Sequence, residues 1–206
     1  MIISPLAYYG LVREFGKGFR QEAALILSDF RIDVRRLVVV STFQGRYFGC
    51  LLPDRKHIAI SSDWIVLLVR SKDLRDLNAF KRLIGHEQGH IYVQKHVQNP
   101  SKDQNAWAKV EEVYADFYSG AQSLDCNRAS LVAALQRVVE LKMRSKHWKD
   151  RMNSSHPSFA QRILYAQRFD WSDDLIKRIL LDAGYVATND LIDNIVTAFP
   201  PPPHLK

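Results

Sequence analysis

The residues with the clearest chemical potential lie in Gly85–His90, which holds a His-Glu-x-x-His pattern within a segment predicted to be helical. An α-helix advances about 100° per residue, so positions i and i+4 lie on one face. His86 and His90 can therefore present two imidazole nitrogens to one metal ion. Glu87 lies beside them, where its carboxylate can reach a water held by the metal. The pattern predicts zinc-dependent peptide hydrolysis; the plainer alternative is a surface helix with two solvated histidines.

A catalytic zinc ion needs a third protein ligand, and His96 is one candidate because its spacing from His90 matches that of metzincins. That arrangement requires the helix to break at Val93, where a glycine is normal. A β-branched residue resists positive φ, so we expect the helix to continue and His96 to point away.

Glu112 is the second candidate for the third ligand. Asn99-Pro100 should end the motif helix and let the next helix return antiparallel, which brings a residue 22 positions after His90 back to the motif. Glu112 and Asp116 share a helix face, so Glu112 can bind zinc while Asp116 accepts a hydrogen bond from a ligand imidazole. Glu111 lies about 100° away on the helix and is the poorer ligand. The alternative is a pair of solvated helix carboxylates.

The elements that must hold these residues form an α+β, mostly helical pattern. Three short runs rich in β-branched or aromatic residues, separated by turn signals, predict a small, mostly antiparallel three-stranded sheet at residues 36–43, 47–52 and 57–61. Periodicity and capping signals predict helices at 5–30 in two pieces, 62–70, 73–97, 103–123, 128–148, from His156-Pro157 onward, 172–183 and 188–198.

The chain shows no internal repeat, and we expect a single domain over residues 1–199. It would comprise N-terminal helices at 1–35, a catalytic core at about 36–170 and C-terminal helices at 171–199. Residues 200–206 form a proline-rich segment that we expect to be a flexible tail.

The composition restricts the expected binding partners and cellular location of the protein. The net charge is +7, but no run of five basic residues appears, so a solvated basic surface is the simplest interpretation and nucleic acid is a weaker alternative. The longest apolar run, Trp64–Val69, is too short for membrane insertion, and the N-terminus lacks the pattern of a signal peptide. Cys50 and Cys126 have no metal-knuckle spacing and are expected to be reduced thiols, which favours a cytoplasmic protein.

Three separated motifs resemble those of gluzincin metallopeptidases of the CAAX prenyl protease and HtpX-like family, in particular its small soluble members. They are His86-Glu87-Gln88-Gly89-His90, Glu112-Val113-Tyr114-Ala115-Asp116 and His156-Pro157-Ser158-Phe159-Ala160-Gln161-Arg162. The resemblance covers roughly residues 45–170 and implies a zincin-like fold, with the sheet packed on the motif helix and on the helix that carries the glutamate ligand.

The same resemblance implies a role for each motif. It implies that His86, His90 and Glu112 ligate one zinc ion per chain and that Glu87 is the general base. It further implies that Asp116 orients a ligand, and that His156 and Arg162 stabilise the oxyanion near the scissile carbonyl. Taken from the residues alone, His156-Pro157 is a helix start with proline in the first turn.

The sequence thus predicts a zinc metalloendopeptidase acting on peptides or proteins, with Glu87 taking a proton from the attacking water. We expect an extended substrate to pair with the strand at residues 57–61. The alternative is an inactive zincin-fold protein that serves as a binding or regulatory module, with a link to nucleic acid.

Overall fold

The computed structural model describes residues 36–40, 49–71, 73–97, 103–121, 127–144, 149–153 and 155–202. The helices expected within residues 1–35 and the residue Cys126 lie outside these ranges, so those predictions are untested.

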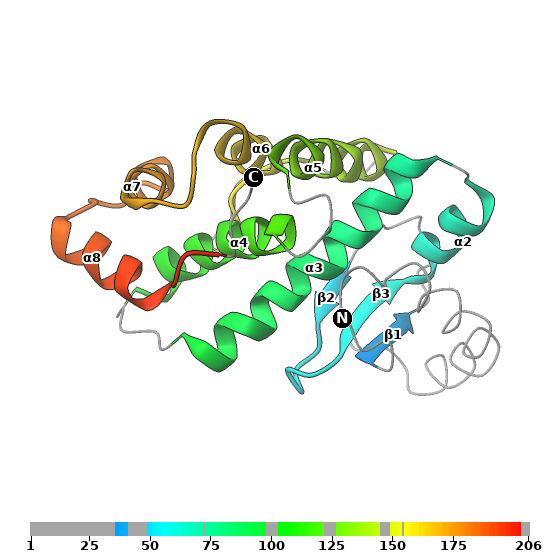
Figure 1. Ribbon diagram of the computed structural model, residues 1–206, viewed down its shortest axis with the longest axis horizontal. Coiled ribbons are helices and arrows are strands. Elements are labelled where there is room, and N and C mark those ends of the chain that lie inside the picture. The colour runs from blue at the N-terminus through cyan, green and yellow to red at the C-terminus, as the bar shows by residue number, and fades with distance from the viewer. Residues whose placement is uncertain are drawn as a thin grey trace.

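The described chain is mostly helical, with one small sheet, as predicted (Figure 1). Its elements, in order, are β1 (Leu37–Val40), β2 (Gly49–Leu51), β3 (Ile58–Ser61), α2 (Ser62–Arg70), α3 (Leu74–His96), α4 (Gln104–Ala121), α5 (Arg128–Met143), α6 (Phe159–Arg168), α7 (Asp173–Asp182) and α8 (Asn189–Ala198).

The sheet is mixed, and the prediction of a mostly antiparallel sheet was wrong. The strand order is β1-β3-β2, with β1 parallel and β2 antiparallel to β3. The β2–β3 hairpin was expected, and its turn is closed by a hydrogen bond from the Leu52 amide to the His57 carbonyl. Turn residues mark where strands end but not which strands pair, and β3, whose residues are all buried, takes the centre with a partner on each edge.

The central strand position of β3 also corrects the expected substrate contact. Because β1 and β2 occupy both of its edges, β3 has no free edge on which a peptide could add as a further strand. In the described sheet, β2 is an edge strand, and it lies against α3. A Cβ placed on Gly49 would be 3.0 Å from Cγ of Leu83 on that helix.

The motif helix α3 is continuous, as expected from Val93. Asp73 caps its start by accepting a hydrogen bond from the Arg75 amide, and the Val97 amide closes its last turn on the Val93 carbonyl. His96 therefore stays on the helix and is exposed, with its ring 4.6 Å from that of Tyr92. The metzincin arrangement is excluded on this ground.

Helix α4 returns antiparallel to α3, as the predicted break required. The Arg82 guanidinium donates to the Ser119 carbonyl, and one helix turn further along α3, His86 contacts Asp116. The two helices approach closely at Gly89, where an added Cβ would lie 2.7 Å from Cα of Ala115. Glycine at this position therefore lets the backbones of α3 and α4 nearly touch beside the motif.

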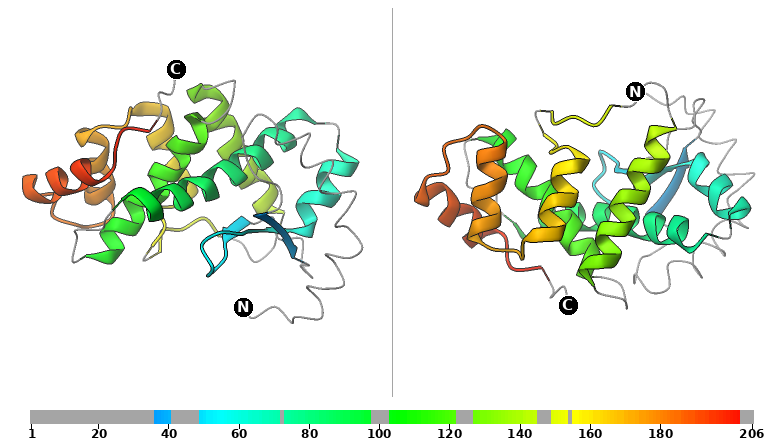
Figure 2. Two further views of the ribbon diagram at one scale, coloured as in Figure 1. Left: turned by 60° about the horizontal axis from the view of Figure 1, so that its bottom comes forward. Right: turned by 90° about the horizontal axis from the view of Figure 1, so that it is seen from above.

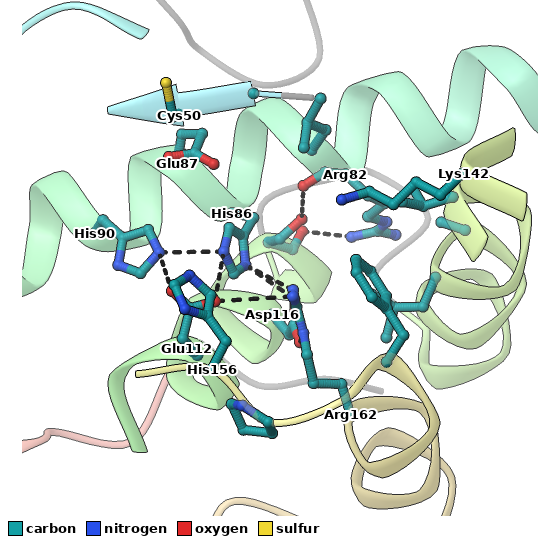
Figure 3. A pocket seen from close by; sticks show the side chains of 18 of the residues that line it. Cys50, Arg82, His86, Glu87, His90, Glu112, Asp116, Lys142, His156 and Arg162 are labelled. Atoms are coloured by element: carbon teal, nitrogen blue, oxygen red, sulfur yellow. Dashed lines mark hydrogen bonds and ion pairs between the residues drawn. The ribbon is translucent and has the colours of Figure 1, made fainter. Parts of the chain in front are cut away.

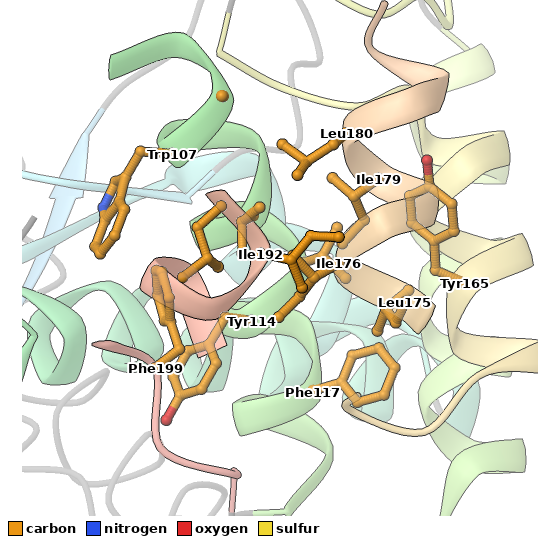
Figure 4. Close-up of a cluster of buried hydrophobic side chains, with 14 of the residues drawn as sticks. Trp107, Tyr114, Phe117, Tyr165, Leu175, Ile176, Ile179, Leu180, Ile192 and Phe199 are labelled. Atoms are coloured by element: carbon orange, nitrogen blue, oxygen red, sulfur yellow. The ribbon is translucent and has the colours of Figure 1, made fainter. Parts of the chain in front are cut away.

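The two largest apolar clusters of the described residues lie around this pair. One lies between the sheet, α2, α3 and α5 and includes Trp64 and Phe80. The other joins α4 to α7 and α8, with Tyr114 and Phe199 in ring contact (Figure 4). Figure 2 shows α5, α6 and α7 side by side along one side of the molecule.

Phe199, just before the expected tail at residues 200–206, is buried, and Pro202, within that segment, is also buried. Among the helices of the described ranges, none combines the length and the apolar composition of a bilayer-spanning segment.

Candidate metal centre

Three side chains from α3 and α4 bring potential ligand atoms to one point (Figure 3). The Nε2 atoms of His86 and His90 are 3.1 Å apart, and each lies 3.3 Å from a different carboxylate oxygen of Glu112. Tetrahedral ligands about 2.0–2.1 Å from a zinc ion are separated by about 3.3 Å. The two imidazole nitrogens therefore lie at the spacing of two corners of a zinc coordination tetrahedron, and one ligand atom from each of the three residues lies within 4.8 Å of the other two.

Each histidine is held through its other ring nitrogen by a carboxylate. Nδ1 of His86 lies 2.9 Å from Oδ1 of Asp116, and Nδ1 of His90 lies 2.8 Å from Oε1 of Glu111. An ionised carboxylate only accepts hydrogen bonds, so both Nδ1 atoms carry protons and donate. The Nε2 lone pairs are thereby left for a metal ion, which is the tautomer that metal-binding histidines require.

The carboxylates around the two histidines raise the pKa of both rings. Burial acts to lower the pKa of His90, but hydrogen bonds to Glu111 and Glu112 prevail and raise it to about 10. For His86, burial and the Arg162 charge act to lower the pKa, while Asp116 and Glu112 raise it above its ordinary value. Protons therefore compete with a metal ion for the two Nε2 atoms.

Glu112 is buried and is held in its ionised form. Burial acts to raise its pKa, yet hydrogen bonds from His156, His86 and His90 keep the pKa well below its ordinary value. Nε2 of His156 is 3.1 Å from Oε1 of Glu112. His156 is about half exposed, so it lies at the rim, where the ligand group opens to solvent.

Arg162 contacts the metal-ligand group through Asp116. Its Nε and Nη2 atoms lie 2.7 and 2.5 Å from the two carboxylate oxygens of Asp116, and its Nη1 is 3.7 Å from Oε2 of Glu112. Burial acts to raise the pKa of Asp116, but the charges of Arg162 and His86 lower it. A chain of contacts thus runs from Arg162 through Asp116 to His86.

Glu87 faces the pocket beside the two histidines, near strand β2 (Figure 3). Within the described ranges its carboxylate makes no hydrogen bond or ion pair, although the residue is buried. It lines a pocket of about 580 Å³ that also contains His86, His90 and Glu112. A carboxylate placed this way is free to exchange protons with a molecule in the pocket.

The segment before α6 carries His156 and is fastened at several points. Asp150 accepts hydrogen bonds from the Phe159 and Ala160 amides at the start of α6. The Asn153 side chain accepts from the His156 amide, and Lys109 of α4 donates to the Asn153 carbonyl. These contacts place His156 over Glu112.

The start of α6 differs from the sequence-based expectation. His156-Pro157 was expected to begin the helix, but Ser158 is its N-cap and forms a capping box with Gln161. Proline in the first turn is a common helix start, and here the serine that follows provides the side chain that accepts the Gln161 amide. His156 is thereby free of the helix and reaches the metal centre.

The seven residues to which the family resemblance gave a role all line this pocket: His86, Glu87, His90, Glu112, Asp116, His156 and Arg162. The histidines and Glu112 form a group that could bind a metal ion, whereas His96 is not part of it.

Two residues were missed. Glu111 was rejected as a zinc ligand, but the 100° offset that excluded it directs it to Nδ1 of His90. Lys142 of α5 also lines the pocket, and its position in the sequence gave no signal. Searches against protein-family models, curated proteins and solved structures found no match to this chain.

Proposed function

We propose that this protein is a zinc-dependent metalloendopeptidase of gluzincin type, related to the CAAX prenyl protease and HtpX-like family. The observation that supports it most directly is the triangle formed by His86, His90 and Glu112, in which both imidazoles are held in the metal-binding tautomer. A structural zinc site is normally closed by four protein ligands, whereas three ligands beside a pocket leave room for water and substrate.

The zinc ion would be held by His86, His90 and Glu112. When bound, it would supply Lewis acidity that lowers the pKa of water to about 7 and polarises a peptide carbonyl. Glu87 then acts as general base: it takes the proton of the attacking water and delivers it to the leaving amine. Its burial beside the metal ligands, without a partner among the described residues, leaves it available for that task.

His156 and Arg162 have different parts in the proposed mechanism. His156 is at the rim, and its Nε2, which lies 3.1 Å from Oε1 of Glu112, would exchange that contact for a hydrogen bond to the developing oxyanion. Arg162 already donates to both oxygens of Asp116. In the proposed mechanism Arg162 therefore orients Asp116 and balances its buried charge, and it does not contact the substrate directly.

The substrate would bind along β2. In the described sheet this strand has one edge paired with β3, and its residues Gly49, Cys50 and Leu51 line the pocket above α3. An extended peptide could add to the other edge, with its scissile bond near Glu87.

Cleavage of a peptide library by zinc-loaded protein tests the proposal. Wild type should cleave, the chelated protein should not, and zinc should restore activity. Glu87→Gln should retain zinc and lose turnover by at least about 100-fold, the lower range of general-base effects. Glu140→Gln, an exposed carboxylate on α5, is the control and should cleave like wild type. Zinc-loaded wild type that cleaves no member of the library, or Glu87→Gln with full activity, would overturn the proposal; the first result would favour a binding module.

A further inference from the structure

The pocket has a second region, away from the metal ligands, whose wall is made by α5. Four buried apolar residues of this helix line it: Leu131, Ala134, Leu135 and Val138. Lys142 follows Val138 by one helix turn, so its side chain leaves the same face and enters the pocket (Figure 3). The ring of Phe159 from α6 completes this region, with Nζ of Lys142 4.8 Å from the ring centre.

Basic residues outnumber acidic ones in this pocket, but most have partners or are exposed. Arg162 is paired with Asp116, and Arg82 donates to the Ser119 carbonyl and the Ser130 hydroxyl. The two other basic residues of the lining, Lys149 and Arg151, are exposed.

Lys142 is different. Within the described ranges no carboxylate lies at ion-pair distance from its ammonium group, which lies over the Phe159 ring. Its side chain is half-buried. Glu112, Glu87 and Asp150 of the lining act on Lys142 electrostatically from beyond ion-pair distance, and Asp150 is also engaged by the amides that begin α6. A partly buried ammonium group without a counterion is unfavourable, so an incoming carboxylate would gain more here than on an open surface.

We propose that Lys142 determines specificity by binding a carboxylate of the substrate, whose carbon atoms pack on Leu135, Val138 and Phe159. This inference rests on the proposed peptidase function and names its substrate class: peptides with a carboxylate close to the scissile bond, on the side of the pocket formed by α5. Two sources carry this chemistry, a Glu or Asp side chain and the C-terminal carboxylate of the chain. The apolar wall favours a group with methylene carbons, which suits Glu over Asp.

The test uses matched peptides that differ at one residue beside the cleaved bond. One set has blocked ends and carries Glu, Gln or Lys; a second set is apolar at that position and ends in a free carboxylate or an amide. Wild type should prefer a carboxylate over its amide in kcat/KM by about 10- to 100-fold, the range of a charge-assisted hydrogen bond. Lys142→Met should lose the preference, and Lys142→Glu should reverse it toward Lys. Lys177→Met, an exposed lysine on α7, should retain it.

Binding of the same peptides to the Glu87→Gln variant, followed by fluorescence anisotropy, separates this inference from the proposed function. If wild type cleaves nothing, a carboxylate preference in binding that Lys142→Met removes still supports the site. Preference confined to the second peptide set supports it and assigns the carboxylate to the chain end. Equal discrimination by wild type and both Lys142 variants, each with normal zinc content, overturns the proposal, and so does the absence of any preference in wild type.

Discussion

Gly89 on α3 lies directly against Ala115 on α4, so close that a Cβ at position 89 would be 2.7 Å from Cα of Ala115. The residue stands between Glu87 and His90 in the motif and is one position before the second histidine. The close approach brings Glu112 within 3.3 Å of both imidazoles. Helix packing at this glycine therefore determines whether a third ligand reaches the motif.

Substituting Gly89 with alanine should weaken both the fold and the metal site. Two effects oppose each other. Alanine favours a helix by about 1 kcal/mol over glycine. However, the new Cβ would clash with the Ala115 backbone, which cannot rotate away, and overpacking of this kind costs about 1–3 kcal/mol. We expect a lower melting temperature and weaker zinc binding in Gly89→Ala. Lys95→Ala, at an exposed site on the same helix, should be neutral or slightly stabilising. A Gly89→Ala protein with unchanged zinc affinity would contradict the proposed role of this contact.

Asp116 and Glu111 should control zinc affinity without binding zinc. Each accepts the Nδ1 proton of one histidine, and loss of such a partner typically lowers metal affinity about 10- to 100-fold. Competition titration with a zinc chelator should show this loss in Asp116→Asn and in Glu111→Gln. Asp190→Asn, an exposed carboxylate on α8, is the matched control. Equal affinity in all three variants would mean that these hydrogen bonds do not hold the ligands.

Zinc affinity should rise with pH. The raised pKa values of His86 and His90, about 10 for His90, mean that protons compete with zinc well above the ordinary histidine range. Each histidine that must lose a proton adds a tenfold gain in affinity per pH unit until the pH passes its pKa. Isothermal titration between about pH 6.5 and 8.5 should therefore show proton release and a steep positive slope. Glu111→Gln removes a hydrogen bond that raises the pKa of His90, so its slope should be smaller. A slope of zero in wild type would be inconsistent with the described site.

Replacing Arg162 should lower the free energy of unfolding far more than replacing an exposed arginine that is also paired with an aspartate. Removing one partner of a buried ion pair leaves an uncompensated charge and costs about 3–5 kcal/mol. Arg162→Met should lose about this much in urea unfolding, because Asp116 would remain buried and ionised. Arg178, an exposed residue of α7 that lies 2.9 Å from Asp182, is the control, and Arg178→Met should cost about 0.3–0.5 kcal/mol. Equal losses in the two variants would contradict the structural role of Arg162.

Much of the candidate metal site could be predicted from the sequence because it follows from helix geometry. The i, i+4 spacing of His86 and His90, and again of Glu112 and Asp116, places each pair on one face without knowledge of the fold. The break after His96 allowed an antiparallel return, which the structure has. Glu111 was missed because it was considered only as a zinc ligand, whereas it contacts the far nitrogen of His90.

The strand pairing of the sheet and the pocket wall made by α5 could not be predicted from the sequence. The parallel pairing of β1 with β3 joins residues about twenty positions apart, such as Leu37 and Ile58, and no local signal specifies it. Lys142 was overlooked for a similar reason. Its approach to Phe159 depends on how α5 and α6 pack, and in the sequence it is one basic residue among many.

The central claim, that His86, His90 and Glu112 together hold a zinc ion, is tested most directly by metal content. Purified wild type, His90→Ala, Glu112→Ala and the control Glu140→Ala should be dialysed against trace zinc and measured by mass spectrometry. Wild type and Glu140→Ala should hold about one zinc ion per chain, and the two ligand variants should hold almost none while remaining helical. A Glu112→Ala protein that keeps as much zinc as wild type would contradict the account.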